Sequence, residues 1–585
     1  MTRKLTYSTL LLLIGTVAWV GVSPPIQSSA PLANLDWPNY GNDLANSRFQ
    51  NVDQINTSNV ANLRPAWIFH TGVLDPVASL EVSPLVVNGV MYVTDGHDDV
   101  FALDAATGQQ KWAYTPTSIP NEMPPLDQIS VCCGRNNRGV AFGNGKVFLG
   151  RLDDVLVALD ASTGAVVWKT TMVDFHDRFS ITMAPKFVNG LVIVGVSGGE
   201  YKVRGQVAAF SADTGNEVWR FFTTQPGTWG GNSWRTGGAP VWESPAIDPE
   251  LGLVYINTGN AAPDINGLLR IGDNLFSASI VALNLNTGQH VWHFQEVHHD
   301  LWDYDSAQPT LLFTLVKDGQ TFPALGHCSK NGNYYILDRR TGEPLYSVKE
   351  TAVPIQPRWQ HASPTQPVSS VEPLTPLSIL AGTVDSAKLP PGISVAPQYT
   401  PPQQQVFLIE PGDDGGCEWP PAAFSPRTNF VYYGTRYEPS IFKASPGNIG
   451  ANQAGQFLGS MFTEHVSGVT DFGLFGATDT TTGKVVWKIR VDQPPKSGLL
   501  VAGDLVFFGE GNGKFHAADA RTGNILFTFD GTSVPNGGGA QASAVAYVVA
   551  GREFVTMAFG GNVPDRSNFP PNPVGDAIIT FALPQ

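Results

Sequence analysis

The sequence predicts an all-β fold, an eight-bladed β-propeller in which each blade is a small antiparallel sheet. Three observations predict it: a turn phrase recurs seven times along the 585 residues, alternating apolar segments separate its copies, and no helix-period pattern competes with them. The segments Ser83–Val93 and Ala184–Val194 are typical of hairpins with Asn-Gly at the tip. Abundant glycine (61) and proline (45) fit many short strands joined by turns.

The recurring phrase is, in its clearest copies, Leu-Asp-Ala-x-Thr-Gly, followed four residues later by an aromatic side chain. The Asp or Asn and the Thr-Gly pair favour a tight turn with positive φ at the glycine. We expect the aromatic side chain to pack back against a neighbouring sheet. The pairs are Gly108 with Trp112, Gly164 with Trp168, Gly215 with Trp219, Gly288 with Trp292, Gly342 with Tyr346, Gly483 with Trp487, and Gly523 with Phe527.

The spacing of these glycines predicts the number of blades. Successive glycines are 56, 51, 73, 54, 141 and 40 residues apart, and all but the fifth spacing are near the length of one four-stranded blade. The gap from Gly342 to Gly483 is expected to hold a blade that lost the phrase, and the candidate is Phe407–Tyr433. Seven blades with the phrase and one without it give eight. Eleven prolines between Pro354 and Pro402 indicate a surface insertion in the same gap.

The first 30 residues are typical of a secretory signal peptide. Arg3 and Lys4 precede an apolar run from Leu10 to Val22, and small residues lead to a cleavage site after Ala30. The run is shorter than the ~20 residues that span a bilayer. We therefore expect one propeller domain, residues 31–585, without a membrane span and located in the periplasm or secreted. Retention as an uncleaved anchor is the alternative.

Charge and cysteine content exclude several classes of protein. The net charge is −15, or −17 after removal of Arg3 and Lys4, which argues against nucleic acid and anionic membranes as partners and is compatible with a basic protein partner. Four cysteines are too few for a disulfide framework. The absence of C-x-x-C-H excludes covalently attached haem.

Cys132 and Cys133 are adjacent, which leaves two interpretations. They are either two unrelated thiols or a vicinal disulfide, whose ring is strained because neighbouring Cα atoms lie only ~3.8 Å apart. A vicinal bridge closes no chain loop and adds almost no stability, so a rigid surface in a binding site is a better reason for it. Whether Cys328 and Cys417 pair is left open by the sequence.

With these motifs the chain resembles the quinoprotein alcohol dehydrogenases, secreted eight-bladed propellers that carry pyrroloquinoline quinone (PQQ). The resemblance covers essentially the whole mature chain. It implies a Cys132–Cys133 disulfide against one face of the cofactor, Trp242 against the other, and Arg138 on a cofactor carboxylate. It also implies cofactor contacts around the edge, from Glu81, Thr182, Ser197, Gly198 and Gly199.

The same resemblance implies a metal ion beside the cofactor. The matching ligands are Glu200 in Ser-Gly-Gly-Glu, Asn260 in Thr-Gly-Asn, and Asp303 and Asp305 in His-His-Asp-Leu-Trp-Asp-Tyr-Asp. Oxygen ligands of this kind select Ca²⁺ or a lanthanide ion over zinc or copper. The neighbouring pair His298-His299 has no third nitrogen or sulfur ligand at suitable spacing, so we interpret these histidines as structural or as supports of the ligands.

The reaction that the resemblance implies is oxidation of an alcohol to the carbonyl compound. Asp303 would take the hydroxyl proton as general base, while the metal polarises a quinone carbonyl and hydride passes to PQQ. Lys330 matches the cation that the family holds near the quinone oxygens. Electrons would then leave to a soluble cytochrome c or a similar acceptor.

Two positions depart from the family pattern. Gly415–Trp419 reads Gly-Gly-Cys-Glu-Trp where relatives commonly have an asparagine before the tryptophan, which puts one cofactor hydrogen bond in doubt. Asp305 replaces the small neutral residue of calcium methanol dehydrogenases and resembles lanthanide-dependent members. In an extended segment Asp303 and Asp305 share one side, so both carboxylates are expected to face one cation. The competing interpretation is that Asp305 points into the substrate pocket or forms a salt bridge, as in sugar-oxidising relatives.

Three other functions remain open: a PQQ-dependent sugar or polyol dehydrogenase, a non-catalytic scaffold of the outer-membrane assembly type, and a hydrolase propeller. A scaffold would retain the repeat but has no reason to keep Cys132-Cys133 together with Glu200, Asn260 and Asp303. A hydrolase needs an activated nucleophile or a paired general acid, and the sequence shows neither.

Overall fold

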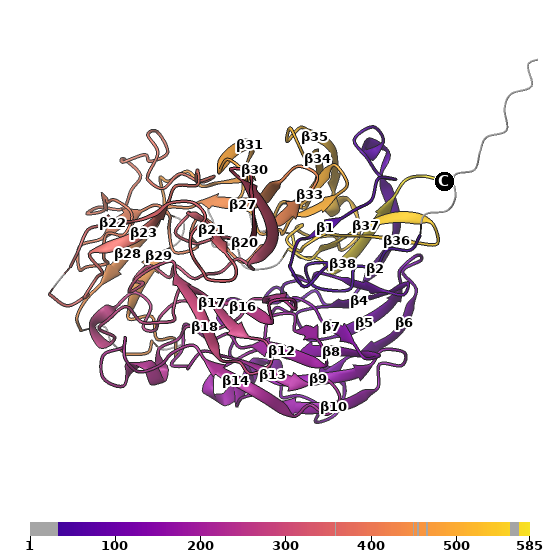
Figure 1. The fold of residues 1–585 in the computed structure, drawn as a ribbon, viewed down its shortest axis with the longest axis horizontal. Helices are drawn as coiled ribbons and strands as arrows, with labels where there is room; N and C mark the ends of the chain where they lie inside the picture. The colour runs from indigo at the N-terminus through magenta and orange to yellow at the C-terminus, as the bar shows by residue number, and fades with distance from the viewer. Residues whose placement is uncertain (1–32, 357, 448–449, 453–454, 464–465, 562–572) are drawn as a thin grey trace, which may run out of the picture.

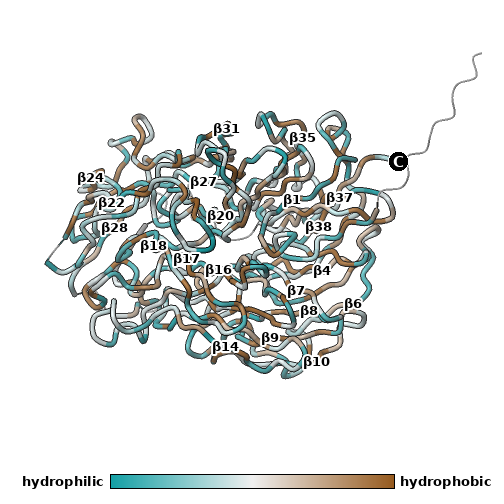
Figure 2. Tube along the Cα trace, viewed as in Figure 1, coloured by the Kyte–Doolittle hydropathy of each residue, from teal (hydrophilic) through white to brown (hydrophobic). Residues whose placement is uncertain are grey.

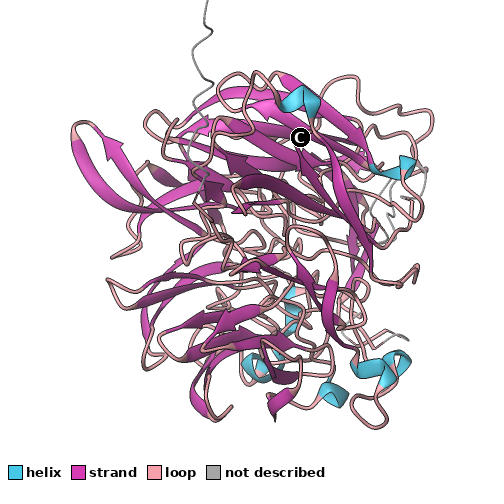
Figure 3. Cartoon of the chain, turned by 90° about the vertical axis from the view of Figure 1, so that its right-hand side faces the viewer, coloured by secondary structure: helices cyan, strands magenta, loops and turns pink. Residues whose placement is uncertain are grey.

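The computed structural model describes residues 33–585 except 357, 448–449, 453–454, 464–465 and 562–572. The predicted signal peptide, residues 1–30, lies outside the described residues. Within the described part of the chain the regular structure is all-β, and the only helices are short 3₁₀ turns (Figure 3). These turns are η1 (Val60–Asn62), η2 (Pro116–Ser118), η3 (Leu126–Gln128), η4 (Phe175–Asp177), η5 (Ser233–Thr236), η6 (Gly267–Leu269) and η7 (Gly531–Ser533). None of the described helices has the length and apolar character needed to cross a membrane.

The described strands form ten sheets, most of which follow one another around a common centre in a propeller-type arrangement (Figure 1). Two of them are β3 (Leu85–Val87), β4 (Val90–Thr94), β5 (Val100–Asp104), β6 (Gln110–Tyr114), and β7 (Ala141–Gly143), β8 (Lys146–Gly150), β9 (Val155–Asp160), β10 (Val166–Thr171). The next are β11 (Lys186–Val188), β12 (Leu191–Gly195), β13 (Gln206–Ser211), β14 (Glu217–Phe222), and β15 (Ala246–Asp248), β16 (Leu253–Asn257), β17 (Ser279–Asn284), β18 (His290–Gln295). A three-stranded sheet follows, with β19 (Leu311–Lys317), β20 (Gln320–Cys328) and β21 (Tyr334–Asp338).

The C-terminal part of the ring includes strands from both ends of the chain. One sheet is β26 (Ala423–Ser425), β27 (Phe430–Tyr437), β30 (Phe472–Asp479), β31 (Lys484–Val491). The next is β32 (Leu500–Ala502), β33 (Leu505–Gly509), β34 (Lys514–Asp519), β35 (Ile525–Asp530), with β1 (Phe49–Gln50) added parallel to β32. The closing sheet is β36 (Val545–Val549), β37 (Arg552–Phe559), β38 (Ala577–Ala582) and β2 (Arg64–His70). Because β2 pairs antiparallel with β38, the N-terminal and C-terminal ends close the ring together (Figure 1).

Aromatic side chains join each sheet to the next one, as predicted. Trp112 packs on the turn glycine of the following repeat, where a Cβ at Gly164 would lie 2.6 Å from the indole ring, and its Nε1 donates to the Ala161 carbonyl at 3.0 Å. Gly164 also has a φ of 74°, so only glycine suits this turn. The same contact recurs for Trp67 on Gly108, Trp168 on Gly215, Trp219 on Gly288, Trp292 on Gly342, Tyr346 on Gly483 and Trp487 on Gly523.

The predicted location of the blade without a turn phrase is wrong. Phe407–Tyr433 does not form one sheet: β25 (Phe407–Ile409) pairs with β28 (Ser440–Ala444), whereas β27 pairs with β30 and belongs to the sheet whose turn carries Gly483. The sheet without its own phrase is the closing one, from β36 to β2. The glycine spacing gave a wrong prediction because β28 and β29 (Ser460–Thr463) are inserted in the chain between β27 and β30 of one sheet. This insertion lengthens the gap before Gly483.

The proline-rich stretch between residues 354 and 402 forms strands outside the ring of sheets. It supplies β23 (Thr365–Ser369), which pairs with β22 (Val348–Ala352), and β24 (Ser394–Val395), which pairs with β25. Figure 1 draws β22, β23, β28 and β29 at the left edge of the molecule.

The hydrophobic core lies between neighbouring sheets. Leu85 and Tyr92 of one sheet pack with Val147 and Leu159 of the next in one buried cluster. Figure 2 shows hydrophobic and hydrophilic stretches alternating along the chain. Inner strands such as β16 are buried along their whole length, whereas outer strands such as β31 are partly exposed. The core therefore fixes the sheets pairwise, and the loops at their ends remain available to line a site.

Candidate active site

One cavity of about 540 Å³ is lined by loops from successive sheets. Its lining includes every site residue predicted from the sequence except Asn260: Glu81, Cys132, Cys133, Arg138, Thr182, Ser197, Gly198, Gly199, Glu200, Trp242, Asp303, Asp305 and Lys330. All of these residues stand between strands, in loops that connect β2 to β3, β6 to β7, β10 to β11, β12 to β13, β14 to β15, β18 to β19 and β20 to β21. The ring of sheets therefore brings together residues that are up to 249 positions apart in the chain.

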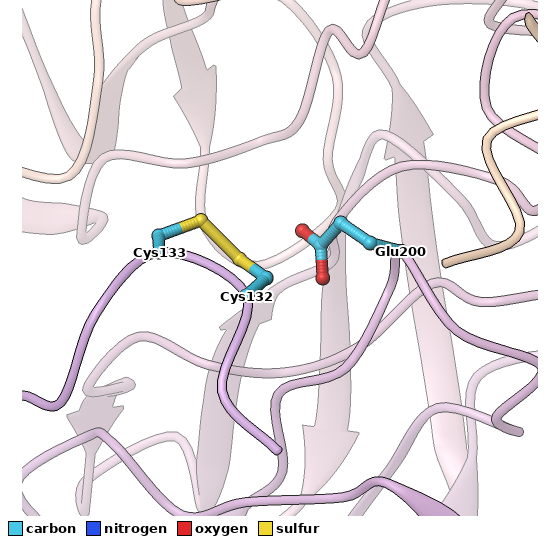
Figure 4. A group of neighbouring side chains, drawn as sticks. All are labelled: Cys132, Cys133 and Glu200. Carbon is cyan, nitrogen blue, oxygen red and sulfur yellow. A yellow bond between two sulfur atoms is a disulfide. The ribbon is translucent and has the colours of Figure 1, made fainter. Parts of the chain in front are cut away.

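Cys132 and Cys133 form a disulfide, with Cα atoms 3.8 Å apart. Cys132 is half-buried and Cys133 is exposed. Figure 4 shows the Glu200 side chain beside this bridge, and one of its oxygens lies within 4.8 Å of both sulfur atoms. In the described part of the chain, no other set of three acidic, histidine or cysteine side chains places its ligand atoms this close together. Because both sulfurs are in a disulfide, this set lacks the thiolates that a sulfur-bound metal requires.

Arg138 is a buried cation held by two carboxylates and two indoles. Its guanidinium lies 3.0 Å from Glu81 and 3.4 Å from Glu243. Its centre is 5.2 Å from the ring of Trp242 and 5.0 Å from that of Trp419. Burial lowers the pKa of Arg138, but Glu243 and Glu81 outweigh burial and hold it above its ordinary value.

Glu243 is a carboxylate beside Arg138 that no sequence motif marked. It is 2% exposed, and neither carboxylate oxygen has a hydrogen-bond partner within the described structure. Burial raises the pKa of Glu243 well above its ordinary value, although Arg138 lowers it. Its position directly after Trp242 is the one signal that could have singled it out.

The loop Ser197–Glu200 requires two glycines. A Cβ at Gly198 would lie 2.7 Å from the Arg178 carbonyl oxygen, and a Cβ at Gly199 would lie 2.2 Å from Asn260 Oδ1. Asn260 is 1% exposed, and both atoms of its amide group lack a hydrogen-bond partner in the described structure. The missing Cβ of Gly199 therefore leaves room for an amide that no described residue satisfies.

Lys330 lies among three acidic side chains. Its Nζ is 3.1 Å from Asp303 Oδ2, 3.8 Å from Asp305 Oδ1 and 3.4 Å from Glu418 Oε1. Burial lowers the pKa of Lys330, but Asp303 and Asp305 outweigh it and raise the pKa well above its ordinary value. Burial raises the pKa of Asp303 well above its ordinary value despite Lys330.

Asp303 and Asp305 both lie next to Lys330, and the extended backbone that was predicted for this segment is wrong. Asp303 has a φ of 63°, so the segment is not the extended strand that the i, i+2 argument assumed. Oδ2 of Asp305 accepts a hydrogen bond from Trp242 Nε1 at 2.9 Å, while its Oδ1 has no hydrogen bond and lies toward Lys330. Asp305 therefore makes the salt bridge of the competing interpretation, and one of its oxygens is left without a hydrogen bond.

The oxygen donors fit a hard cation. Asn260 Oδ1 and Asp305 Oδ1 are buried and lack hydrogen bonds in the described structure, and Asn260 lies directly behind Gly199 of the lining. Glu200, Asp303 and Asp305 place carboxylates along the cavity, and in the described structure no three of them bring oxygens within 4.8 Å of one another. Burial raises the pKa of Glu200 to about 7, and Asp305 contributes to this shift. Mutual repulsion of these acids is what a bound cation would relieve.

The segment Gly415–Trp419, which departs from the family pattern, makes four contacts in or next to the site. Cys417 is joined to Cys328 by a disulfide, which settles the pairing that the sequence left open. The Gly416 amide donates to the Lys330 carbonyl at 2.6 Å, and Glu418 lies beside the Lys330 ammonium group. Trp419 faces Arg138, so this segment contacts both Lys330 and Arg138.

His298 and His299 do not line the cavity. The ring nitrogens of His299 lie 2.6 Å from the Gly272 carbonyl oxygen and 2.7 Å from that of Gln360. His298 Nε2 lies 3.1 Å from Glu350 and its Nδ1 lies 2.8 Å from Gln295. Both histidines hold neighbouring segments of the chain, in agreement with the structural interpretation.

Comparison with known proteins gives two family matches. The family described as "Glucose/ethanol/alcohol dehydrogenase, beta-propeller domain" matches residues 37–457, and the family described as "Outer membrane protein assembly factor BamB" matches residues 449–565. The second match includes none of the predicted site residues.

Individual relatives extend over most of the chain. A quinohemoprotein alcohol dehydrogenase of Comamonas testosteroni is 33% identical over 90% of this chain and 72% of its own length. The quinoprotein alcohol dehydrogenase PedH of Pseudomonas putida is 32% identical over 90% of this chain and 86% of its own length. A solved structure described as a europium-containing methanol dehydrogenase superposes with a TM-score of 0.77 at 29% identity, covering 94% of this chain and 98% of that one.

Proposed function

The chain belongs to the quinoprotein alcohol dehydrogenase family, and we propose that it oxidises an alcohol to the aldehyde or ketone with bound PQQ as the oxidant. The two electrons then pass singly to an external acceptor of the cytochrome c type. One observation carries the proposal: a single cavity unites the Cys132–Cys133 disulfide, Trp242, Arg138 and the acidic set around Lys330.

The residues divide into two groups with different tasks. The disulfide, Trp242 and Arg138 would hold a flat anionic cofactor, because they offer a rigid surface, an indole face and a guanidinium group. Glu200, Asn260, Asp303 and Asp305 would hold the cation, Ca²⁺ or a lanthanide ion. When bound, the cation supplies a Lewis acid and PQQ supplies the two-electron acceptor.

Asp303 is the general base in this proposal. Its carboxylate would accept the substrate hydroxyl proton, and Lys330 keeps Oδ2 in place through the 3.1 Å contact. The positive charge of Lys330 also counters negative charge that develops nearby during oxidation. Burial of the group excludes bulk water, which strengthens both electrostatic effects.

The choice of cation is part of the proposal. Asp305 adds a further negative charge next to Asp303, and a trivalent ion gains more from it than Ca²⁺ does. This supports a lanthanide ion, although the contact of Asp305 with Lys330 also suits a divalent ion. Turnover of PQQ-loaded protein, measured with La³⁺ and with Ca²⁺, distinguishes a lanthanide-dependent from a calcium-dependent enzyme. Higher activity with Ca²⁺ would exclude lanthanide dependence.

A PQQ-dependent polyol or sugar dehydrogenase is the second candidate, because charged side chains also line the cavity. Asp413, Asp414, Arg436 and Lys496 border it in addition to the residues named above. Dye-linked assays on simple alcohols, polyols and sugars decide between the substrates. The spectrum of protein reconstituted with PQQ and each cation tests cofactor binding in the same samples, and failure of PQQ to bind would refute both dehydrogenase proposals.

The proposal also includes export of the protein to the periplasm or medium and a propeller of eight blades. The pattern of residues 1–30 supports export, and the mature chain from residue 31 forms a single domain with the stretch 354–402 as an insertion. Eight blades are supported by the seven aromatic contacts between successive sheets, together with the closing sheet of β2 and β38.

A further inference from the structure

Asp264 is a carboxylate of the cavity wall that none of the roles above uses. Its side chain is fully buried, and neither carboxylate oxygen has a hydrogen-bond partner within the described structure. It lies four residues after Asn260 in the same connection between β16 and β17. Leaving a buried charged group unpaired costs more than ~1–3 kcal/mol, so an isolated ionised carboxylate is an unfavourable element of a fold.

The charges around Asp264 are mainly negative. Burial raises the pKa of Asp264 most, and repulsion by Glu200 and then by Asp305 raises it further, while Arg270 opposes the shift. Asp264 in turn is one of the groups that repel Asp303. Four carboxylates therefore share one region of the cavity, and Asp264 belongs to it electrostatically although it lies outside the predicted motifs.

Arg270 and Lys330, two buried cations of this region, make their hydrogen bonds and ion pairs with other groups. Arg270 donates to main-chain carbonyl oxygens, among them those of Pro263 and Asp264 itself, and to the amide oxygen of Asn274. Its guanidinium donates hydrogen bonds to the loop and not to the Asp264 carboxylate, on which it acts only through its charge. Lys330 contacts Asp303, Asp305 and Glu418, and among the described ion pairs none includes Asp264.

We propose that Asp264 is a fourth acidic group of the cation site, acting with Glu200, Asp303 and Asp305, and that it makes the site select a trivalent ion over a divalent one. This inference rests on the proposed function, because it concerns the cation of that same site. Carboxylate and amide oxygens are the donors that hard cations prefer. Each further negative charge favours a trivalent ion more than a divalent one, since the Coulomb energy scales with the product of the charges.

The test is a competition measurement that does not depend on turnover. PQQ-loaded protein is dialysed to equilibrium against mixtures of La³⁺ and Ca²⁺, and the bound metals are counted by elemental mass spectrometry. Asp264→Asn, which keeps the size of the side chain and removes its charge, is expected to lower the preference for La³⁺ about tenfold or more. Asp264→Glu, which keeps the charge, is expected to retain most of it.

Asp154 provides a matched control. It is also fully buried with both carboxylate oxygens lacking hydrogen bonds, but it does not line the cavity. Asp154→Asn should leave the metal preference unchanged. Asp264→Ser serves as a second variant if Asp264→Asn does not fold, as judged by its circular dichroism spectrum.

Three results would overturn the inference. The first is an unchanged La³⁺ preference in both charge-removing variants. The second is an equal loss of preference in Asp154→Asn. The third is an unchanged preference combined with a higher KM for polyols or amino alcohols, which would assign Asp264 to substrate binding. Absence of PQQ binding or of alcohol oxidation in the wild-type protein would instead refute the proposed function, so the two failures are distinguishable.

Discussion

Replacing Asp303 with asparagine is expected to lower turnover by about 10²–10⁴-fold, the range that removal of a general base produces. At 1.36 kcal/mol per factor of ten, this is about 2.7–5.4 kcal/mol of lost transition-state stabilisation. The amide oxygen can still accept the hydrogen bond from Lys330, which now spans 3.1 Å to Oδ2. The variant thus removes the proton acceptor but keeps the contact with the Lys330 ammonium group.

The same variant is expected to fold at least as stably as the wild-type protein when no cation is bound. Burial and the neighbouring carboxylates raise the pKa of Asp303 above its value in the unfolded chain. A raised carboxyl pKa means that ionisation at neutral pH costs stability, so the neutral amide avoids this cost. Thermal unfolding of the metal-free proteins checks this, and the midpoint of the variant should not fall below that of the wild type.

The assay for Asp303→Asn combines a cofactor titration with dye-linked turnover. PQQ should bind with near wild-type affinity, and turnover should fall while KM changes little. Glu418→Gln is the matched control, because Glu418 also contacts Lys330 but has no proposed role as base. Its turnover should stay within tenfold of the wild type. Turnover of Asp303→Asn within a few-fold of the wild type, with cation and PQQ bound, would refute the assignment of Asp303 as base.

Further predictions concern the remaining parts of the structure. Lys330→Met should destabilise the metal-free protein by about 3–5 kcal/mol, because it leaves buried carboxylates unpaired. Added La³⁺ should restore much of the lost stability. An unfolding free energy equal to that of the wild type would contradict this prediction. Cys133→Ser should weaken PQQ binding but leave the unfolding free energy nearly unchanged, because the vicinal bridge closes no loop. Cys417→Ala should instead lower the free energy of unfolding by about 4 kcal/mol, because its bridge to Cys328 spans 89 residues. An equal loss of unfolding free energy in both cysteine variants would be inconsistent with stabilisation by loop closure. Trp219→Ala should cost about 3–5 kcal/mol in chemical unfolding through loss of the contact on Gly288, whereas a cost below 1 kcal/mol would argue against a stabilising role for that contact.

The sheets were predictable from sequence wherever the fold depends on local signals. The turn at Gly164 needs a positive φ and a missing Cβ, and the partner indole of Trp112 is specified by the previous copy of the same phrase. The prediction failed at β25 because an insertion between β27 and β30 separates strands that pair in space. No local signal distinguishes an inserted sheet from a blade.

The candidate site was predictable where a motif marks each residue. Glu200 and Lys330 stand in recognisable loops, and the ring of sheets brings both loops to the same cavity. Asp264 was missed because a single acid in a loop has no pattern, and its importance depends on charges that meet it only in three dimensions. The Cys328–Cys417 disulfide could not be predicted from sequence either, because 89 residues separate the two cysteines and no local pattern links them.

A single-turnover experiment without an electron acceptor tests directly whether bound PQQ oxidises the alcohol. Protein loaded with PQQ and cation is mixed anaerobically with excess alcohol, and the carbonyl product is counted against bound PQQ. We expect one equivalent of aldehyde or ketone per PQQ, a matching change in the cofactor spectrum, and no product when PQQ is omitted. Formation of product without PQQ, or a PQQ-loaded protein that yields none from any alcohol, polyol or sugar, would contradict this expectation.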